Sequence, residues 1–216
     1  VYNEDITMPA LPGTAKWAER SGKAADPALV ERTKNGSIKG SYQDEGADQK
    51  LQHHVQLLGS GPIMNRVLEA RQILAEKYGV SSDVWSVTSY QQLRFDALEA
   101  DRWNRLHPEQ DARVPFLTSA LSGAEGPFIA ASDYVKALSD LVREWIPGQL
   151  TSLGAEGFGM SDTREELRRH FEIDKEFVVI GTLEALVKQG KLDRKVLAQA
   201  IVDLGVNPEK IDPLHI

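Results

Sequence analysis

The sequence predicts an α/β fold in which a mostly parallel sheet is covered by helices on both faces. From residue 52 onward, short apolar runs typical of buried strands alternate with segments whose apolar residues recur at helical spacing. The chain has 216 residues, 41% of them hydrophobic, which is enough to bury a substantial core. We therefore expect an arm or linker over residues 1–50 and an α/β domain over residues 51–216.

The arm differs from the rest of the chain in composition. Residues 1–12, VYNEDITMPALP, are expected to be extended because their prolines oppose helix. Residues 13–50 are polar and contain glycines, and they indicate a surface arm with a single helical turn at Pro27–Arg32. The chain begins at Val1 rather than at methionine, so we expect it to be part of a longer polypeptide.

The first strand and helix of the domain lie around LLGSGPIM. Val55–Leu58 is expected to be a buried strand, and Gly59–Gly61 turns the chain. Pro62 suits the first position of a helix, where its missing N–H costs nothing. One face of the helix that follows, which ends at Gly79, carries these apolar residues: Ile63, Val67, Leu68, Leu74 and Tyr78.

The same alternation continues through the middle of the domain. Further strands are expected at Val84–Val87, Phe128–Ala131 and Leu150–Leu153. A helix is expected at Tyr90–Trp103, closed by His107 and Pro108. Another amphipathic helix, capped by Ser132, is indicated by Tyr134, Leu138, Leu141 and Trp145.

The last part is expected to be helical. Ser161 or Asp162 can cap a helix that runs to His170, with Glu165 and Glu166 in its first turn. Two further helices are expected at Phe177–Gln189 and Val196–Leu204, stopped by Gly190 and Gly205.

Charge and composition argue against several kinds of partner. The net charge is −7 and no basic run occurs, so we expect no nucleic acid and no membrane surface as partner. No apolar run approaches the roughly 20 residues that span a bilayer. The absence of cysteine excludes disulfides, thiolate metal ligands and a cysteine nucleophile, and it fits a cytoplasmic protein.

LLGSGPIM resembles a nucleotide-binding turn only in part. A dinucleotide fingerprint needs a third glycine where Met64 stands, and an acidic residue at the end of the second strand, where the chain has Thr88 and Ser89. The Gly-Lys-Ser/Thr of a phosphate-binding loop is also absent. We interpret this stretch as a structural turn.

The second glycine-rich stretch, GAEGFGMSD, has two interpretations. Its amides near Ser161 and Asp162 could bind a small anion beside the following helix. Four acidic residues oppose that interpretation: Glu156, Asp162, Glu165 and Glu166. We favour a shaped, capped loop that docks against another subunit or domain.

No catalytic or metal-binding residues are predicted. His53 and His54 are adjacent at a strand start, so they point to opposite faces, and we expect both at the surface. His107 and His170 lack a carboxylate at metal-ligand spacing, and no G-x-S-x-G nucleophile elbow occurs. The helix pair over Phe177–Leu204 carries too few basic residues for a DNA-binding helix-turn-helix.

Several blocks, in order along the chain, together resemble one family. They are Asn3-Glu4, Met8-Pro9, Pro12, IKGSY (Ile38–Tyr42), VQLLGSGPI (Val55–Ile63), YGVSSDVWSVTSY (Tyr78–Tyr90), DRWNRLHP (Asp101–Pro108), RVPF (Arg113–Phe116), ASDYVK (Ala131–Lys136) and GFGMSDTREELRRHFEID (Gly157–Asp174). This series resembles the carboxy-terminal domain of the homodimeric bacterial pyruvate dehydrogenases, which have a transketolase-like architecture. The resemblance implies a three-layer α/β/α domain with a mixed, mostly parallel sheet, and it makes residues 1–50 the end of a middle domain plus a linker.

The family resemblance also implies function. The whole enzyme would use thiamine diphosphate and Mg²⁺ to decarboxylate pyruvate and would acetylate lipoyl groups of a dihydrolipoyl acetyltransferase. Those cofactors are held by the other domains, so no catalytic, cofactor or metal residue is expected in this chain. Its expected partners are the rest of its own polypeptide, a homodimer partner and the acetyltransferase.

The resemblance implies a supporting role beside the dimer interface. The expected contact or active-site rim is the glycine-rich loop: Glu156, Gly157, Phe158, Gly159, Ser161 and Asp162. Glu156 replaces a common Asp, Met160 replaces a frequent Arg, and the arm Thr14–Asn35 is longer than usual. Two alternatives stay open: a module that binds the acetyltransferase or a regulator, and a small-anion-binding domain.

Overall fold

The computed structural model describes residues 27–45 and 51–215 of the chain. Its strands are β1 (Ser41–Glu45), β2 (His53–Gly59), β3 (Val80–Val87), β4 (Phe128–Ala131) and β5 (Leu150–Leu153). Its α-helices are α2 (Pro27–Lys39), α3 (Met64–Tyr78), α4 (Tyr90–Leu106), α5 (Phe116–Ala120), α6 (Lys136–Asp140), α7 (Arg164–His170), α8 (Lys175–Lys188) and α9 (Arg194–Asp203). Short 3₁₀ turns are η1 (Gly61–Ile63), η2 (Arg143–Trp145) and η3 (Pro213–His215). The expected extended segment 1–12 lies outside the described residues.

The strands form one five-stranded sheet in the order β1-β3-β2-β4-β5. Only β1 is antiparallel, so the sheet is mixed and mostly parallel, as the sequence predicts. Gly59 pairs with Ala131, which in turn pairs with Leu153. The carboxyl ends of β2, β4 and β5 therefore lie at one edge of the sheet.

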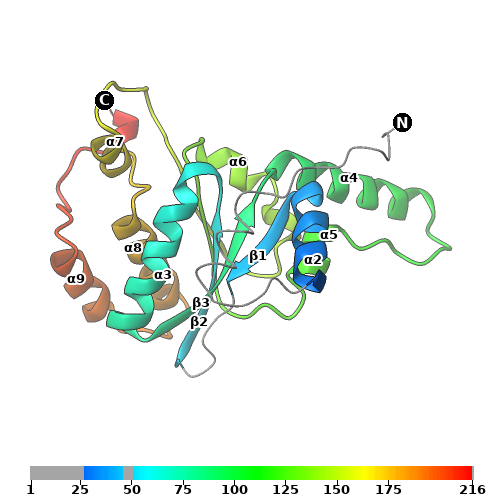
Figure 1. Cartoon of the computed structure of the whole chain (residues 1–216), viewed down its shortest axis with the longest axis horizontal. Helices are drawn as coiled ribbons and strands as arrows, with labels where there is room; N and C mark the ends of the chain where they lie inside the picture. Colours follow the sequence, from blue (N-terminus) through cyan, green and yellow to red (C-terminus); the bar gives the residue numbers. More distant parts are fainter. Residues whose placement is uncertain (1–26, 46–50, 216) are drawn as a thin grey trace.

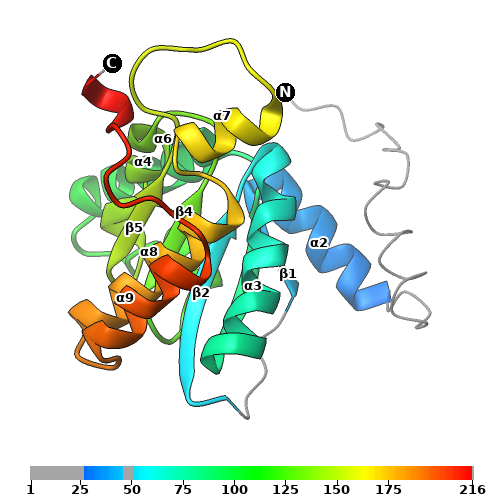
Figure 2. The ribbon, with the colours of Figure 1, turned by 90° about the vertical axis from the view of Figure 1, so that its left-hand side faces the viewer.

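The domain has three layers (Figures 1 and 2). Helices α3, α8 and α9 cover one face of the sheet, and α4 and α5 cover the other, with α2 beside α5. Neighbouring residues of β2 serve the two faces, because strand side chains alternate: Val55 and Leu57 belong to the core against α3 and α8, whereas Leu58 belongs to the core against α4 and α5.

Two predicted strands are longer in the structure, and two segments of the arm differ from the prediction. Strands β2 and β3 begin earlier than predicted, at His53 and Val80. In β3, Ser81 and Ser82 are only 2% exposed and pair with β2 in parallel register. Instead of a single turn, residues 27–39 form the whole of α2. The polar segment SYQDE, expected in the arm, forms the edge strand β1.

The prediction of one helix through Tyr134, Leu138, Leu141 and Trp145 is wrong. The chain forms α6, then the separate turn η2, and Tyr134 is 61% exposed before α6. Polar contacts to β5 hold this shape: Ser152 Oγ donates to Asp140 Oδ1 at 2.6 Å, and Arg143 donates to the Leu150 carbonyl oxygen at 2.6 Å. Ser132 accepts from the Tyr134 amide and does not cap α6.

The DRWNRLHP block forms the end of α4 and the start of the connection to α5. Helix α5 was not predicted. The His107 ring stacks on Trp103 at 3.7 Å between centroids, and the Arg113 guanidinium lies 3.5 Å from the same ring centroid. Asn104 binds both the amide and the carbonyl of Arg113. This block is therefore structural. Among the described residues, none of the helices has the length and apolar character to cross a bilayer.

Candidate functional site

The glycine-rich loop that follows β5 is anchored at its base. Glu156 Oε1 accepts from the backbone N–H of Lys136 at 2.7 Å, and the amide of Ala155 donates to the Tyr134 carbonyl at 2.9 Å. A side chain at Gly154 would lie 2.4 Å from that same Tyr134 oxygen. The Glu156 carboxylate therefore binds the backbone at the start of α6, and this hydrogen bond explains why an acidic residue suits position 156.

The tip of the loop rests on the C-terminal turn η3. Gly157 has φ +86°, and an added Cβ would lie 2.1 Å from the Pro213 carbonyl oxygen. Beyond this contact the loop is open: Phe158 is 80% exposed and Gly159 has no atom within 4 Å of a Cβ position. In η3, the Leu214 amide holds the pKa of Asp212 below its ordinary value, with His215 adding to the effect.

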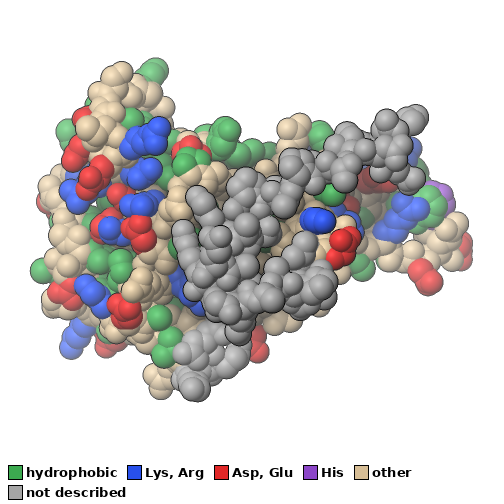
Figure 3. Space-filling view, in the orientation of Figure 1, with side chains coloured by type: hydrophobic (Ala, Val, Ile, Leu, Met, Phe, Trp, Pro, Cys, Tyr) green, Lys and Arg blue, Asp and Glu red, His purple; other side chains and the backbone are tan. Residues whose placement is uncertain are grey.

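Exposed apolar side chains collect around the loop. We name this set the loop patch, which consists of Tyr134, Val135, Phe158, Met160 and Leu214. The contacts of Ala155 with Tyr134 and of Gly157 with Pro213 bring its members to one end of the domain. Hydrophobic side chains are visible along the upper edge in Figure 3. An apolar surface of this kind is typical of a site that another protein surface covers.

The helix after the loop is capped one residue later than predicted. Thr163, not Ser161 or Asp162, is the N-cap of α7, and its Oγ1 accepts from the Glu166 amide at 3.3 Å. Asp162 Oδ1 accepts from the Thr163 amide at 2.6 Å. Side-chain oxygens thus occupy the amides of Thr163 and Glu166, and the small-anion interpretation near Ser161 and Asp162 stays a prediction.

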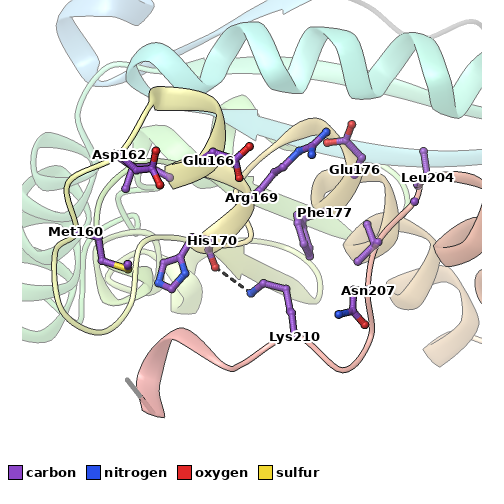
Figure 4. Close-up of a pocket in the computed structure, with 13 residues that line it drawn as sticks. Met160, Asp162, Glu166, Arg169, His170, Glu176, Phe177, Leu204, Asn207 and Lys210 are labelled. Carbon is purple, nitrogen blue, oxygen red and sulfur yellow. Dashed lines mark hydrogen bonds between the residues drawn. The ribbon is translucent and has the colours of Figure 1, made fainter.

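A cavity of about 330 Å³ separates α7 and α8 from the C-terminal segment (Figure 4). Lys210 crosses it, donating to the His170 carbonyl at 3.0 Å and to Glu172 Oε1 at 2.9 Å. Glu172 has φ +59°, a conformation that costs a non-glycine residue energy, and Lys210 holds this bend in place. The cavity is thus tied together by a salt bridge whose role is structural.

The same cavity is lined by basic and acidic side chains. The basic residues are Arg169, His170 and Lys210, and the acidic residues are Asp162, Glu166 and Glu176. The Glu176 Oε2 atom is buried and has no hydrogen-bond partner in the described part of the chain. Within residues 27–45 and 51–215, no group of three or more His, Asp or Glu side chains could hold a metal ion. We find no nucleophile and base paired in this cavity.

The prediction that His53 and His54 both lie at the surface is wrong for His54, which is partly buried. His54 Nε2 lies 2.9 Å from Asp83 Oδ2, and its Nδ1 lies 3.3 Å from Ser81 Oγ. A serine, a histidine and an aspartate in contact are the parts of a nucleophilic triad. Ser81 is only 2% exposed, so its hydroxyl cannot meet a substrate. The three residues connect β2 with β3.

The turn in LLGSGPIM brings a helix close to a strand. A Cβ at Gly59 would lie 2.6 Å from Met64 Sδ and 3.1 Å from Met64 Cα, so glycine at this position lets α3 start close to β2. The Ser60 amide donates to the Ala131 carbonyl at 3.1 Å, which ties the turn to β4. These contacts support the interpretation of this stretch as a structural turn.

Comparison with known proteins identifies relatives. Residues 40–174 match the family described as "Transketolase-like TK C-terminal domain". The chain is 44% identical to the pyruvate dehydrogenase E1 component of Pseudomonas aeruginosa over 189 residues, which are 87% of this chain and 21% of that protein. It is 37% identical to the E1 component of Mycobacterium tuberculosis over 215 residues, which are 97% of this chain and 21% of that protein. The chain thus spans about a fifth of the length of these relatives.

Solved structures also resemble the chain. A transketolase from Leishmania mexicana matches with a TM-score of 0.45 and 20% identity, over 71% of this chain and 19% of that one. A split gene transketolase, described as an inactive β4 tetramer, matches with a TM-score of 0.43 and 17% identity, over 68% of this chain and 42% of that one.

Proposed function

Because this chain belongs to the family of transketolase-like C-terminal domains, we propose that it is the carboxy-terminal domain of a pyruvate dehydrogenase E1 component. The complete enzyme decarboxylates pyruvate in the cytoplasm and transfers the acetyl unit to lipoyl groups of a dihydrolipoyl acetyltransferase. Within it, residues 51–216 are the body of the domain, and the preceding residues link it to a middle domain and supply the edge strand β1.

The proposal depends above all on the extent of the match with E1 components. Identity between 37% and 44% continues over 87% to 97% of this chain in relatives from distant bacteria. The matched stretch therefore covers nearly all of the sheet and its helices as well as the loops between them. A chain similar to E1 components over almost its whole length is expected to occupy the same place in such an enzyme.

We propose that thiamine diphosphate and Mg²⁺ are bound outside the described residues of this chain. A magnesium-diphosphate site needs several oxygen ligands in one place, and the described residues offer no such group of carboxylates and histidines. We therefore assign no step of decarboxylation to these residues. The complete E1 component would hold both cofactors in its other domains, and this domain would support their arrangement.

We assign the loop patch the role of a contact with the second subunit. Phe158 is 80% exposed and Met160 is 48% exposed, and the loop that carries them is anchored just before Phe158, by Glu156 and by the close approach of Gly157 to Pro213. A fixed loop loses little conformational entropy when it binds. Apolar side chains presented on such a loop therefore suit an isologous contact with a second copy of the enzyme.

The experiment replaces Phe158 with Asp in the full-length enzyme and uses Val202→Asp as the matched control. Val202 is 71% exposed and lies on α9, away from the loop. Sedimentation should show that F158D dissociates at a concentration at which V202D stays dimeric, and pyruvate turnover should fall in parallel. Equal dimerisation of the two variants would remove the loop patch from the interface.

A second experiment tests whether cofactor binding and catalysis belong to the other domains. The 216-residue chain should show no heat of binding when titrated with thiamine diphosphate and Mg²⁺, and no turnover of pyruvate. Micromolar binding or turnover by this chain alone would contradict the assignment of catalysis to other domains.

A second candidate function is direct binding of the acetyltransferase. Its support is a set of exposed apolar residues on α4 and the following segment, where the ribbon projects from the body in Figure 1: Phe95, Leu98, Leu106 and Val114. Retention of this chain by immobilised acetyltransferase at low salt would favour it. If Phe95→Ser leaves that retention unchanged, α4 is not the contact.

A further inference from the structure

The carboxyl edge of the sheet contains a place where two chain connections diverge. After β2 the chain passes to α3 on one face, and after β4 it passes to α6 on the opposite face. The two strands are neighbours in the sheet. In open α/β sheets, this separation of neighbouring connections creates a crevice in which ligands bind.

The structure has a cavity of about 460 Å³ at this place. Pro62 and Ile63 come from the turn after β2, Asp133 follows β4, and Ala155 follows β5. Helix α7 closes the remaining side, above the start of α3 in Figure 2. The turn in LLGSGPIM, although structural, thus forms part of a cavity wall.

Two arginines from α7 line this cavity. Arg164 and Arg168 are four residues apart, so both lie on the same face of the helix. Within the described ranges, neither guanidinium has an ion pair or a side-chain hydrogen bond, whereas the neighbouring Arg169 reaches Glu165 on the same helix. Among the described residues that line the cavity, the only acidic side chain is that of the exposed Asp133. Arginines left without a partner at a cavity are suited to bind an anion through paired N–H groups.

The rest of the lining is apolar. Ile63 and Ile173 are 1% and 4% exposed, and Leu167 and Phe171 of α7 complete the wall. A bare ion would leave this surface without a partner, whereas a ligand with an organic body would cover it. The single carboxylate of Asp133 can accept a hydrogen bond from a ligand hydroxyl.

We propose that this cavity binds a small organic phosphomonoester, with its dianionic phosphate on Arg164 and Arg168 and its organic body on the apolar wall. The charge of two arginines matches a dianion better than a single carboxylate. The proposal does not depend on the assignment of the chain to pyruvate dehydrogenase, since it rests on the cavity alone.

The test uses phenyl phosphate as the probe, with inorganic phosphate and phenol as partial probes. Calorimetric titration of the 216-residue chain should give saturable binding of phenyl phosphate, weaker binding of inorganic phosphate and none of phenol. Replacement of both arginines, Arg164→Gln with Arg168→Gln, should weaken phenyl phosphate binding about tenfold or more. Thermal melting shows whether the double variant folds, and each single variant repeats the test if it does not.

The matched control is Arg194→Gln. Arg194 begins α9, is exposed, and has no ion pair among the described residues, so it tests unspecific attraction of the anion to a free arginine. R194Q should bind phenyl phosphate as the unaltered chain does. The proposal is overturned if phenyl phosphate does not bind saturably, if phenol binds as tightly, or if R194Q and the double variant lose the same affinity.

Discussion

Gln56 and Asp83 meet across two neighbouring parallel strands, with Gln56 Nε2 3.0 Å from Asp83 Oδ2. Gln56 is fully buried, and its side-chain oxygen also accepts from Trp85 Nε1 at 2.7 Å. The Asp83 carboxylate further accepts from Gln43 Nε2 at 2.7 Å, and His54 lies beside it. One carboxylate thus connects β1, β2 and β3 at the amino end of β2.

Replacing Gln56 with Leu should destabilise the domain by about 1–3 kcal/mol, because it leaves the Trp85 N–H without its acceptor and removes one of the hydrogen bonds to the Asp83 carboxylate. Chemical denaturation measures this as a lower midpoint. In the double variant Q56L with Trp85→Phe, both partners are apolar, so the loss should be smaller than the sum of the single losses. As a control, Gln72→Leu on the exposed face of α3 should change stability by less than about 0.5 kcal/mol. Additive effects in the double variant would mean that the two side chains are not coupled.

Truncation of Leu57 should be costly, because this residue is fully buried in the central strand β2. Leu57→Ala should lower the free energy of unfolding by about 2–5 kcal/mol through lost apolar contact and the cavity left behind. Leu57→Asp should prevent folding, since it places an unpaired charge in the core. Leu106→Ala, at a residue 55% exposed on α4, should have little effect. A melting temperature of L57D equal to that of the unaltered chain would contradict the position of β2.

We expect the buried hydroxyl of Tyr90 to lower the free energy of unfolding of the domain. It is 2% exposed, its hydroxyl has no hydrogen-bond partner among the described residues, and burial raises its pKa. Tyr90→Phe should therefore stabilise the domain by about 1 kcal/mol at neutral pH. Above pH 10 the unfolded chain loses the phenol proton while the folded chain retains it, so stability falls as pH rises. That fall should be smaller in Y90F, and the difference between the two proteins should widen with pH.

The comparison for Tyr90 is Tyr134→Phe, since Tyr134 is 61% exposed. Denaturation curves of the three proteins at pH 7 and between pH 9 and 11 give the measurement. If Y90F is less stable than the unaltered chain at pH 7, the hydroxyl has a stabilising partner.

The sequence predicts the fold best where strands are apolar. The predicted strand Phe128–Ala131 coincides with β4, because a short apolar run between turn residues favours a buried strand, and Leu150–Leu153 coincides with β5. It fails where strands are polar. Ser81 and Asp83 in β3 are matched by hydrogen bonds to β2 partners 27 to 29 residues away, and no local pattern indicates such partners.

The candidate site shows the same limit. Glycines and caps identify the loop at residues 156–162, since their local chemistry is visible in the sequence. The cavity with Arg164 and Arg168 was missed, because its walls come from η1, α7 and the ends of β4 and β5. Spatial convergence of four segments follows from topology, and the spacing of residues in one segment does not indicate it.

Gly157→Ala should detach the loop tip from the C-terminal turn. At φ +86° an alanine costs about 1–2 kcal/mol, and its Cβ would lie 2.1 Å from the Pro213 carbonyl oxygen, so η3 must move. We expect hydrogen exchange at the Leu214 and His215 amides, which are bonded to Asp212, to accelerate about tenfold. Gly159→Ala is the matched control two residues away, where no atom lies within 4 Å of the new Cβ. Exchange of η3 at the same rate in both variants would show that the loop does not hold the C-terminal turn in place.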